Sequence, residues 1–250
     1  MNEHCQELVS RGDKDRYLSC LFAPQSVRPH LLALYAFNIE IARIRETVSE
    51  PHLGLVRHQW WLDTIDAIYA GNVPSHPVAL GLASAIEQGH LPKHSLVNLI
   101  TAREFDLYDD AMPSLTDLEG YLGETSSALI QLAALILGES AADAAGLAGV
   151  AFGLAGVLRN RKKTYLPIDM VQKWGETETV KQLCAHARKR LAEARALLPT
   201  IPPKALPAFL PASLTGLYLA RIERFPNGSV DVTQLRRQAV MWWAARNNRF

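Results

Sequence analysis

The sequence predicts an all-α protein, and three observations support this. Apolar residues recur at steps of three and four along most of the chain, as in Leu31, Leu34 and Ile39, which is the spacing of one face of a helix. Prolines stand near the first positions of several periodic stretches, where a helix tolerates them. Alternating runs of β-branched residues with hairpin turns are absent. We therefore expect helices throughout.

The first two predicted helices are bounded by prolines. A short helix over Asp15–Phe22 is stopped by Pro24. A long helix over Val27–Glu50 follows, with Ser26 as its N-cap residue. It ends before Pro51, because the residue preceding a proline is pushed out of the helical region.

The next three helices carry clear boundary signals. Leu53–Tyr69 has most of its apolar residues on one stripe, and Gly71 closes it. Pro77–Gly89 and Pro92–Asp110 each begin with a proline at a position where the missing N–H is harmless. The sequence thus favours three separate helices here.

Ser114–Leu137 is predicted as one helix because it has both a start and a stop signal. Ser114 is followed three residues later by Asp117, as in a capping box, and Gly138 ends the stretch.

Three further helices complete the chain. Glu176–Leu197 is amphipathic and rich in charge, and a proline-rich connection leads to a helix near Pro211–Arg224. Asp231–Arg246 closes the chain, and we expect Trp242 and Trp243 to anchor this helix.

Ala141–Leu158 is a predicted helix with a stripe of glycines on one face. Each glycine costs about 0.5 to 1 kcal/mol relative to alanine inside a helix, so the stripe needs a reason. One reason is close packing on a neighbouring helix, and the other is room for an elongated apolar ligand. Both remain open. The glycines are Gly146, Gly149, Gly153 and Gly156.

Composition excludes several classes of protein. The chain has 250 residues, 48% of them hydrophobic, and a formal net charge of +1. No linker or charge block divides it, so we expect a single domain over residues 1–250. The near-zero charge argues against a nucleic-acid-binding protein. Three scattered cysteines predict neither disulfides nor a zinc site. No apolar run of about 20 residues suggests a membrane span, so we expect a cytoplasmic protein, at most peripheral on a membrane.

Charged residues gather at the end of the long Val27–Glu50 helix. Asn38 and Glu46 follow its apolar face, beside Glu40, Arg43 and Arg45. Ionisable groups next to a buried stripe need partners or a ligand. The alternative is that Glu40 and Arg43 form a surface pair and Glu46 faces water.

Two other charged clusters are candidate sites. The cations Arg159, Arg161, Lys162 and Lys163 follow a helix C-terminus, where the dipole would explain one or two of them. The carboxylates Glu104, Asp106, Asp109 and Asp110 have helical i, i+4 spacing that could share a metal ion, although a solvated helix end explains them too. Asp63 and Glu124 either project into a cavity or pair with arginines.

Five segments together resemble the squalene and phytoene synthase family. They are DRYLSCLFAPQSVRPHLLALYAFN, QWWLDTIDAIYAG, LPKHSLVNLITAREFDL, TDLEGYLGETSSAL and GLAGVLRNRKKTYLP, which span Asp15 to about Trp174. The resemblance implies an isoprenoid-synthase-like bundle of helices around a central cavity, in which two isoprenoid diphosphates are joined. We expect the Val27–Glu50, Pro92–Asp110, Ser114–Leu137 and Ala141–Leu158 helices to line this cavity.

The chain departs from the family at both acidic motifs. Where the active enzymes carry two aspartates that hold Mg²⁺, this sequence has Ala42 and Glu46. After Arg159 the second motif is replaced by Asn160, Arg161 and Lys162, and the connection to Tyr165-Leu166-Pro167 is shorter than usual by roughly six residues. Since Mg²⁺ requires several carboxylate or phosphate oxygens, we expect no tight Mg²⁺ cluster.

Two segments are similar in sequence to one branch of this family: FNIEIARIRETVSEPHLGLVRHQWW and YLGETSSALIQLAALILG. Members of that branch lack the paired aspartates and assist the assembly of respiratory NADH:quinone oxidoreductase (complex I). This resemblance implies an assembly factor, peripheral at the inner membrane, with a complex I subunit as its client. The cations that stand where the enzymes carry acids, together with the glycine stripe, favour an isoprenoid or anionic lipid as its ligand. The resemblance implies no cofactor. The alternative is a Mg²⁺-dependent head-to-head prenyltransferase acting on isoprenoid diphosphates.

The candidate site residues follow from these clusters and from the resemblance. Glu46, Glu104 and Asp106 are the candidate catalytic residues, and Glu46, Asp106 and Asp110 are the candidate metal ligands. The candidate anion- or substrate-binding residues are Arg28, Tyr35, Asn38, Arg43, Arg159, Arg161 and Tyr165.

Overall fold

The all-α prediction is confirmed by the computed structural model, which describes residues 3–226 and 230–250. In total 79% of the residues are helical, and the described residues contain no β-strand. Contacts divide the chain into two compact units, each with its own buried core. The first comprises Met1–Asp109 and Leu132–Glu139, and the second Asp110–Gln131 and Ser140–Phe250. The single domain over residues 1–250 stays a prediction.

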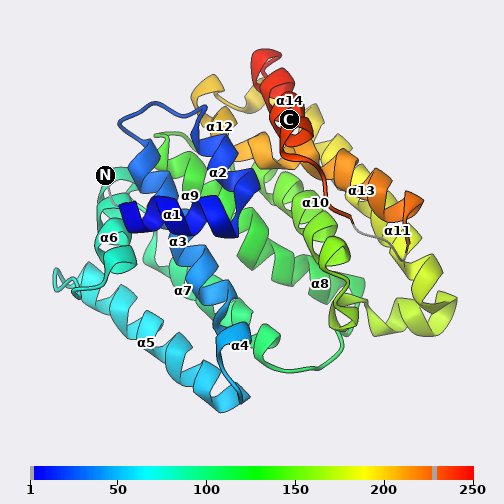
Figure 1. Cartoon of the computed structure of the whole chain (residues 1–250), viewed down its shortest axis with the longest axis horizontal. Coiled ribbons are helices and arrows are strands. Elements are labelled where there is room, and N and C mark those ends of the chain that lie inside the picture. Colours follow the sequence, from blue (N-terminus) through cyan, green and yellow to red (C-terminus); the bar gives the residue numbers. More distant parts are fainter. Residues whose placement is uncertain (1–2, 227–229) are drawn as a thin grey trace. The chain divides into compact units, whose positions relative to one another are not determined.

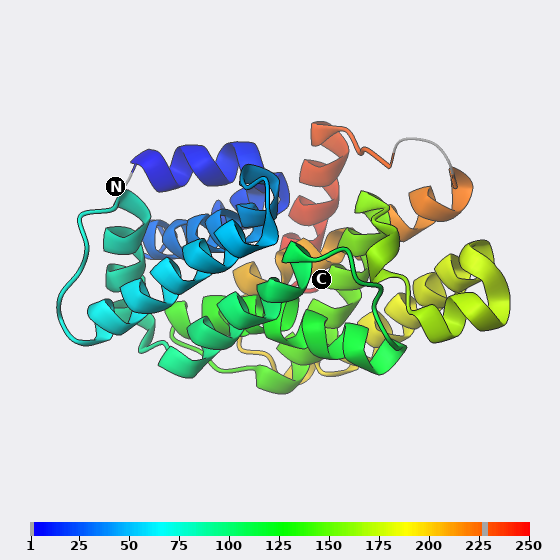
Figure 2. The same cartoon turned by 90° about the horizontal axis from the view of Figure 1, so that it is seen from below.

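The first unit is built around α3 (Figure 1), whose residues 31–39 are all buried. A helix that is covered on every side must be apolar nearly all round, as LLALYAFNI is. The neighbouring helices α1 and α6 pack against α3, and α5 runs beside α7 (Figure 2). The elements are α1 (Glu3–Gly12), α2 (Lys14–Cys20), α3 (Arg28–Ala42), α4 (Ile44–Thr47), α5 (Pro51–Tyr69), α6 (Pro77–Gly89), α7 (Lys93–Ala102) and a 3₁₀ helix, Arg103–Leu107.

The second unit is built around α10, which packs along α11 and also contacts α8 and α13. Its main helices are α8 (Leu115–Leu122), α10 (Ala142–Asn160), α11 (Ile168–Ala196), α12 (Leu206–Phe209), α13 (Thr215–Arg224) and α14 (Gln234–Arg246). Between α8 and α9 (Ala128–Ile136) lies a π-helix, Gly123–Ser127, and the boundary between the units falls within α9. Short 3₁₀ helices cover Lys163–Tyr165, Leu198–Thr200, Pro203–Ala205 and Leu210–Leu214.

Local signals identified several helix ends correctly. The predicted helix Pro77–Gly89 has the same bounds in the structure. The Ser114 side chain accepts a hydrogen bond from the backbone N–H of Asp117, as its capping role predicts. Gly138, predicted to end a helix, has a φ of +81°, which glycine adopts without steric cost.

Other boundaries were wrong because helices are interrupted without a local signal. Val27–Glu50 is divided at Arg43 into α3 and α4, and Val27 rather than Ser26 is the N-cap residue of α3. The predicted Pro92–Asp110 helix changes to a 3₁₀ helix at Arg103 and ends at Leu107. The π-helix interrupts Ser114–Leu137, and α1 is an additional helix. In α11 the stretch before Gly175 is additional, whereas Gly175 itself has a φ of +77° and breaks the helix just before Glu176, where the predicted helix begins.

Two helical stretches are long and apolar enough to cross a bilayer by length and composition alone. They are Ala142–Asn160 and Pro203–Arg224, so the expectation that no stretch reaches this length does not hold. In their most apolar windows 44% and 78% of the residues are buried inside the protein. Core helices of soluble proteins have the same properties, so this finding is weak support for a membrane span.

Candidate functional site

The end of α3 does not present the arrangement expected for the first acidic motif. Arg43 ends α3, and Glu46 belongs to the separate four-residue helix α4. The side chains of Arg43 and Glu46 are both exposed. Glu46 is therefore not carried by the same continuous helix as Asn38, and its candidate roles in catalysis and metal binding stay predictions.

A buried polar cluster lies in the first unit, one helical turn before Arg43. Asn38 is 6% exposed, and the side chain of Asp106 is 7% exposed. Arg103 joins them: its Nη1 donates to Asp106 Oδ2 at 3.1 Å, and its Nη2 donates to Asn38 Oδ1 at 3.5 Å. An ion pair balances the buried charge. The structure thus brings together two predicted site residues, Asn38 and Asp106.

His58 belongs to the surroundings of this cluster and was missed by the sequence analysis. It lies on α5 and is only 1% exposed. Burial lowers its pKa, the carboxylate of Asp106 opposes that effect, and Arg103 adds to it, so the ring is neutral at pH 7. A single polar residue in the stripe of α5 gave no pattern that could have identified it.

Of the other acidic candidates, Glu104 shares the short 3₁₀ helix Arg103–Leu107 with Asp106, and Asp109 and Asp110 lie beyond its end. The chain leaves the 3₁₀ helix at Leu107, and Tyr108 is extended. The i, i+4 spacing of Asp106 and Asp110 therefore does not place them on one helix face, which corrects the geometry assumed for a metal site. Glu104 is half-buried and Asp110 is exposed. Among the described residues, no group of three or more His, Cys, Asp or Glu side chains is placed to hold a metal ion.

The cations that follow α10 have contacts within the second unit. The Arg159 guanidinium lies over the Tyr218 ring, 4.5 Å from its centroid. Arg161 ends α10 in a left-handed conformation and donates to the Phe225 carbonyl at 2.8 Å. Lys163 forms an ion pair with Glu176 at 2.8 Å. These contacts stabilise the fold, so they explain three of the four cations without a ligand. The fourth, Lys162, is exposed.

Three predicted ligand-binding residues also have structural roles. Arg28 donates to the carbonyls of Ala23 and Leu21 at 2.9 and 2.8 Å, which secures the turn before α3. Tyr35 is 2% exposed, and the Tyr165 hydroxyl lies 3.4 Å from that of Tyr121. None of these contacts tests ligand binding.

Part of the glycine stripe on α10 is explained by close packing. A Cβ at Gly149 would lie 2.3 Å from Ser127 Cα, and one at Gly153 would lie 2.7 Å from a methyl carbon of Leu122. The Ser127 hydroxyl donates to the Gly146 carbonyl at 2.8 Å. A Cβ at Gly146 or Gly156 would meet no atom within 4 Å. The packing hypothesis is thus confirmed for two of the four glycines.

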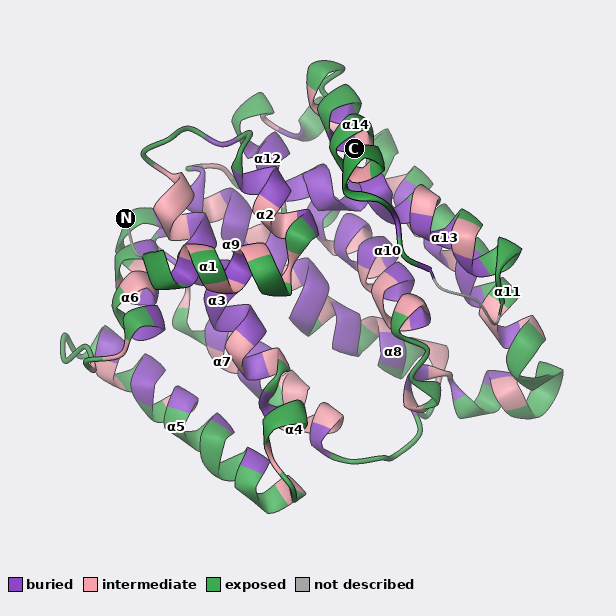
Figure 3. Ribbon diagram, viewed as in Figure 1, coloured by how far each residue is buried: buried purple, intermediate pink, exposed green. Residues whose placement is uncertain are grey.

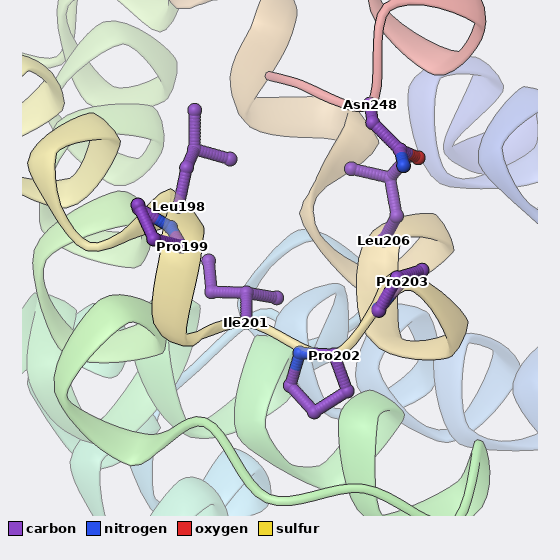
Figure 4. Close-up of a pocket in the computed structure, with 7 residues that line it drawn as sticks. All are labelled: Leu198, Pro199, Ile201, Pro202, Pro203, Leu206 and Asn248. Atoms are coloured by element: carbon purple, nitrogen blue, oxygen red, sulfur yellow. The ribbon is translucent and has the colours of Figure 1, made fainter.

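A pocket of about 360 Å³ lies elsewhere in the second unit (Figure 4). Its lining side chains are apolar except for that of Asn248, and no predicted site residue lines it. The lining residues are Leu198, Pro199, Ile201, Pro202, Pro203, Leu206 and Asn248.

The Glu40 carboxyl group titrates close to neutral pH. Its side chain is 24% exposed, and its Oε2 lies 3.9 Å from His76 Nε2. Its described neighbour is therefore His76 and not Arg43, with which a surface pair was predicted. Burial raises the pKa of Glu40 from 4.5 to about 7. Burial also lowers the pKa of His76, so the histidine is neutral when Glu40 ionises.

We predict that Glu40 makes the protein less stable as the pH rises. The native state binds more protons than the unfolded chain between the two pKa values of Glu40, 4.5 and about 7. Its contribution is therefore present at low pH and is lost as the pH rises through about 7. Urea unfolding across this range should show a flatter pH dependence for Glu40→Gln. The exposed Glu87→Gln is the control, and an equal flattening in both variants would contradict the prediction.

Comparison with known proteins agrees with this fold. The family model for squalene/phytoene synthase matches residues 9–243, and the chain belongs to this family. Two solved structures share the fold. A squalene synthase HpnC from Alicyclobacillus acidocaldarius has a TM-score of 0.79 at 19% identity, covering 91% of this chain and 95% of that one. A dehydrosqualene synthase has a TM-score of 0.79 at 17% identity, covering 97% and 94%.

The curated relatives carry a different description. The chain is 33% identical over 246 residues to the human protein named NADH dehydrogenase (ubiquinone) complex I, assembly factor 6, covering 89% of this chain and 74% of that protein. The Bos taurus protein of the same name is 34% identical with the same coverage. A homologue from Drosophila melanogaster is 29% identical, covering 89% and 75%.

Proposed function

We propose that this protein is an assembly factor for respiratory NADH:quinone oxidoreductase and not a prenyltransferase. The observation that carries the proposal is the identity of about one third, over most of the chain, to curated proteins named as complex I assembly factors. We place it in the cytoplasm, peripheral at the inner membrane, with a complex I subunit as its client.

The contacts of the candidate carboxylates support this choice. Asp106 is paired with Arg103, and Glu46 is exposed on the separate short helix α4. The family resemblance puts Ala42 and Asn160 where the enzymes carry aspartates. Ionising an allylic diphosphate requires several divalent ions, each held by oxygen ligands. These residues fit a metal cluster poorly.

Deleting the gene in its own organism tests the proposal. We expect loss of assembled NADH:quinone oxidoreductase on native gels and loss of NADH-driven quinone reduction. Succinate-driven quinone reduction should not change. A gene carrying Glu46→Gln should restore assembly as fully as the wild-type gene, because only the prenyltransferase alternative, and not the assembly role, depends on that carboxylate. Normal complex assembly in the deletion strain would refute the proposal, and Mg²⁺-dependent joining of prenyl diphosphates would favour the alternative.

We also propose that the chain binds an apolar anion without a metal ion, with no cofactor. The exposed turn after α10 carries Arg161 and Lys162 beside Arg159. Guanidinium groups match phosphate oxygens directly. Within the second unit Tyr165 is a further proposed contact, and Arg28, Tyr35, Asn38 and Arg43 of the first unit stay candidates from the sequence.

The test is binding of a prenyl diphosphate to the full chain in EDTA. We expect saturable binding that weakens with salt and falls about tenfold in Arg159→Ala/Arg161→Ala. Because both arginines have internal contacts, Lys162→Gln serves as a second variant whose folding should be unaffected. In a separate titration without EDTA, calorimetry should detect no Mg²⁺ binding with a Kd below about 0.1 mM. Equal binding by all three proteins, or a requirement for Mg²⁺, would remove the idea.

A further inference from the structure

Helix α14 has one face packed on the second unit and an apolar face directed outward. Met241 and Ala244 are buried where α14 contacts the 3₁₀ helix Leu210–Leu214. On the other side Leu235, Trp242 and Trp243 are 78%, 57% and 50% exposed. Figure 3 shows much of α14 coloured as exposed. The prediction that both tryptophans anchor the helix is therefore wrong.

Cations surround this apolar face, and carboxylate side chains are absent from its sequence. Arg236, Arg246 and Arg249 are exposed, and residues 232–250 contain no Asp or Glu. The Arg249 guanidinium lies 3.8 Å from the centroid of the Trp243 ring, and that of Arg246 lies 6.0 Å from Trp242. These cation–π contacts keep apolar rings and positive charges on the same surface.

We propose that this surface of α14 docks on an anionic lipid membrane. Tryptophan prefers the boundary between lipid headgroups and acyl chains, where its ring is buried and its N–H stays hydrated. The arginines would lie at the level of the lipid phosphates, which attract them. A helix of this kind lies in the plane of the membrane surface and does not cross it. We call this face the α14 surface. It comprises Leu235, Arg236, Trp242, Trp243, Arg246 and Arg249.

Charge distinguishes the α14 surface from the other exposed apolar face, on α5. There Val56 and Trp60 are 66% and 43% exposed. The neighbouring Glu50 and Asp63 are exposed carboxylates, which anionic lipids would repel. Only the α14 surface combines exposed tryptophans with an acid-free sequence among the described residues, and this favours lipid phosphate over a protein partner. The inference names a surface for the peripheral membrane contact proposed above, but it rests on α14 alone and does not depend on the role in complex I assembly.

Flotation of the full-length protein with vesicles tests the inference. One set contains equal parts of phosphatidylcholine and phosphatidylglycerol, and the other contains phosphatidylcholine alone. We expect binding to the anionic vesicles only, weakened by salt. Trp242→Gln/Trp243→Gln should reduce the partition coefficient at least about tenfold. Arg236→Gln/Arg246→Gln should weaken binding and its salt dependence.

Trp174 provides a matched control in the same unit. It is 43% exposed, and Lys173 Nζ lies 4.5 Å from its ring centroid, but Glu176 and Glu178 follow it closely. Trp174→Gln should bind vesicles as the wild type does. All variants change exposed residues, so their unfolding curves should match that of the wild type. Absence of vesicle binding by the wild type, equal loss in the Trp174 variant, or equal binding to both kinds of vesicle would overturn the proposal.

Discussion

Replacing Gly149 by alanine is expected to lower the free energy of unfolding by about 3 kcal/mol, at the upper end of the usual cost of overpacking. The new Cβ would lie 2.3 Å from Ser127 Cα, 2.4 Å from its Oγ and 2.5 Å from its backbone N. A side chain could rotate away, but two of these atoms belong to the backbone of the π-helix. Relief therefore requires α10 and the π-helix to separate. Urea unfolding of the purified variant measures the change.

The same helix supplies two control substitutions. Gly146→Ala and Gly156→Ala also replace a glycine in α10, but their Cβ atoms would meet nothing within 4 Å. Because alanine loses less backbone entropy than glycine, each is expected to raise the free energy of unfolding by about 0.5 to 1 kcal/mol. If all three variants changed stability equally, the close approach of α10 to the π-helix would be disproved.

Replacing Arg103 by methionine is expected to lower the free energy of unfolding by about 3 kcal/mol. Methionine keeps much of the apolar length but leaves the nearly buried Asp106 carboxylate without its charged donor. Asn38 loses a hydrogen bond as well. The double variant Arg103→Met/Asp106→Leu should recover most of the loss, since it removes the Asp106 charge together with the cation.

An exposed ion pair with the same spacing is the control. Lys181 Nζ lies 3.2 Å from Glu178 Oε2, and the two side chains are 63% and 41% exposed. Exposed pairs contribute little because water screens them, so Lys181→Met should change stability by less than about 0.5 kcal/mol. A cost for Lys181→Met equal to that for Arg103→Met would show that burial does not strengthen the Arg103 pair.

The helices themselves could be predicted because their signals are local. Pro77 at the first position, Ser114 with Asp117 and Gly138 each act within one or two turns of the chain. The interruptions could not. Arg43 and the residues around it have no helix-breaking composition, yet α3 ends there and α4 packs against α5 and the 3₁₀ helix Arg103–Leu107.

The sequence predicted some of the residues of the buried polar cluster, but not how they are arranged. Asn38 and Asp106 were identified, but the residue that joins them, Arg103, and the buried His58 nearby were not. Each depends on where α3, α5 and the 3₁₀ helix meet. A helical wheel reports which face of one helix is polar, not which polar groups another helix brings to it.

The sequence by itself determined the helical class, several helix ends and the family, because helix periodicity and capping act over a few residues. Only the tertiary structure decided which partner each charged group has. Glu119, for example, accepts hydrogen bonds from Arg190, 71 positions away, at 2.6 and 3.0 Å. Likewise the exposure of Trp242 and Trp243 depends on which face of α14 is packed. Burial and pairing depend on contacts between segments distant in the chain, which no local pattern specifies.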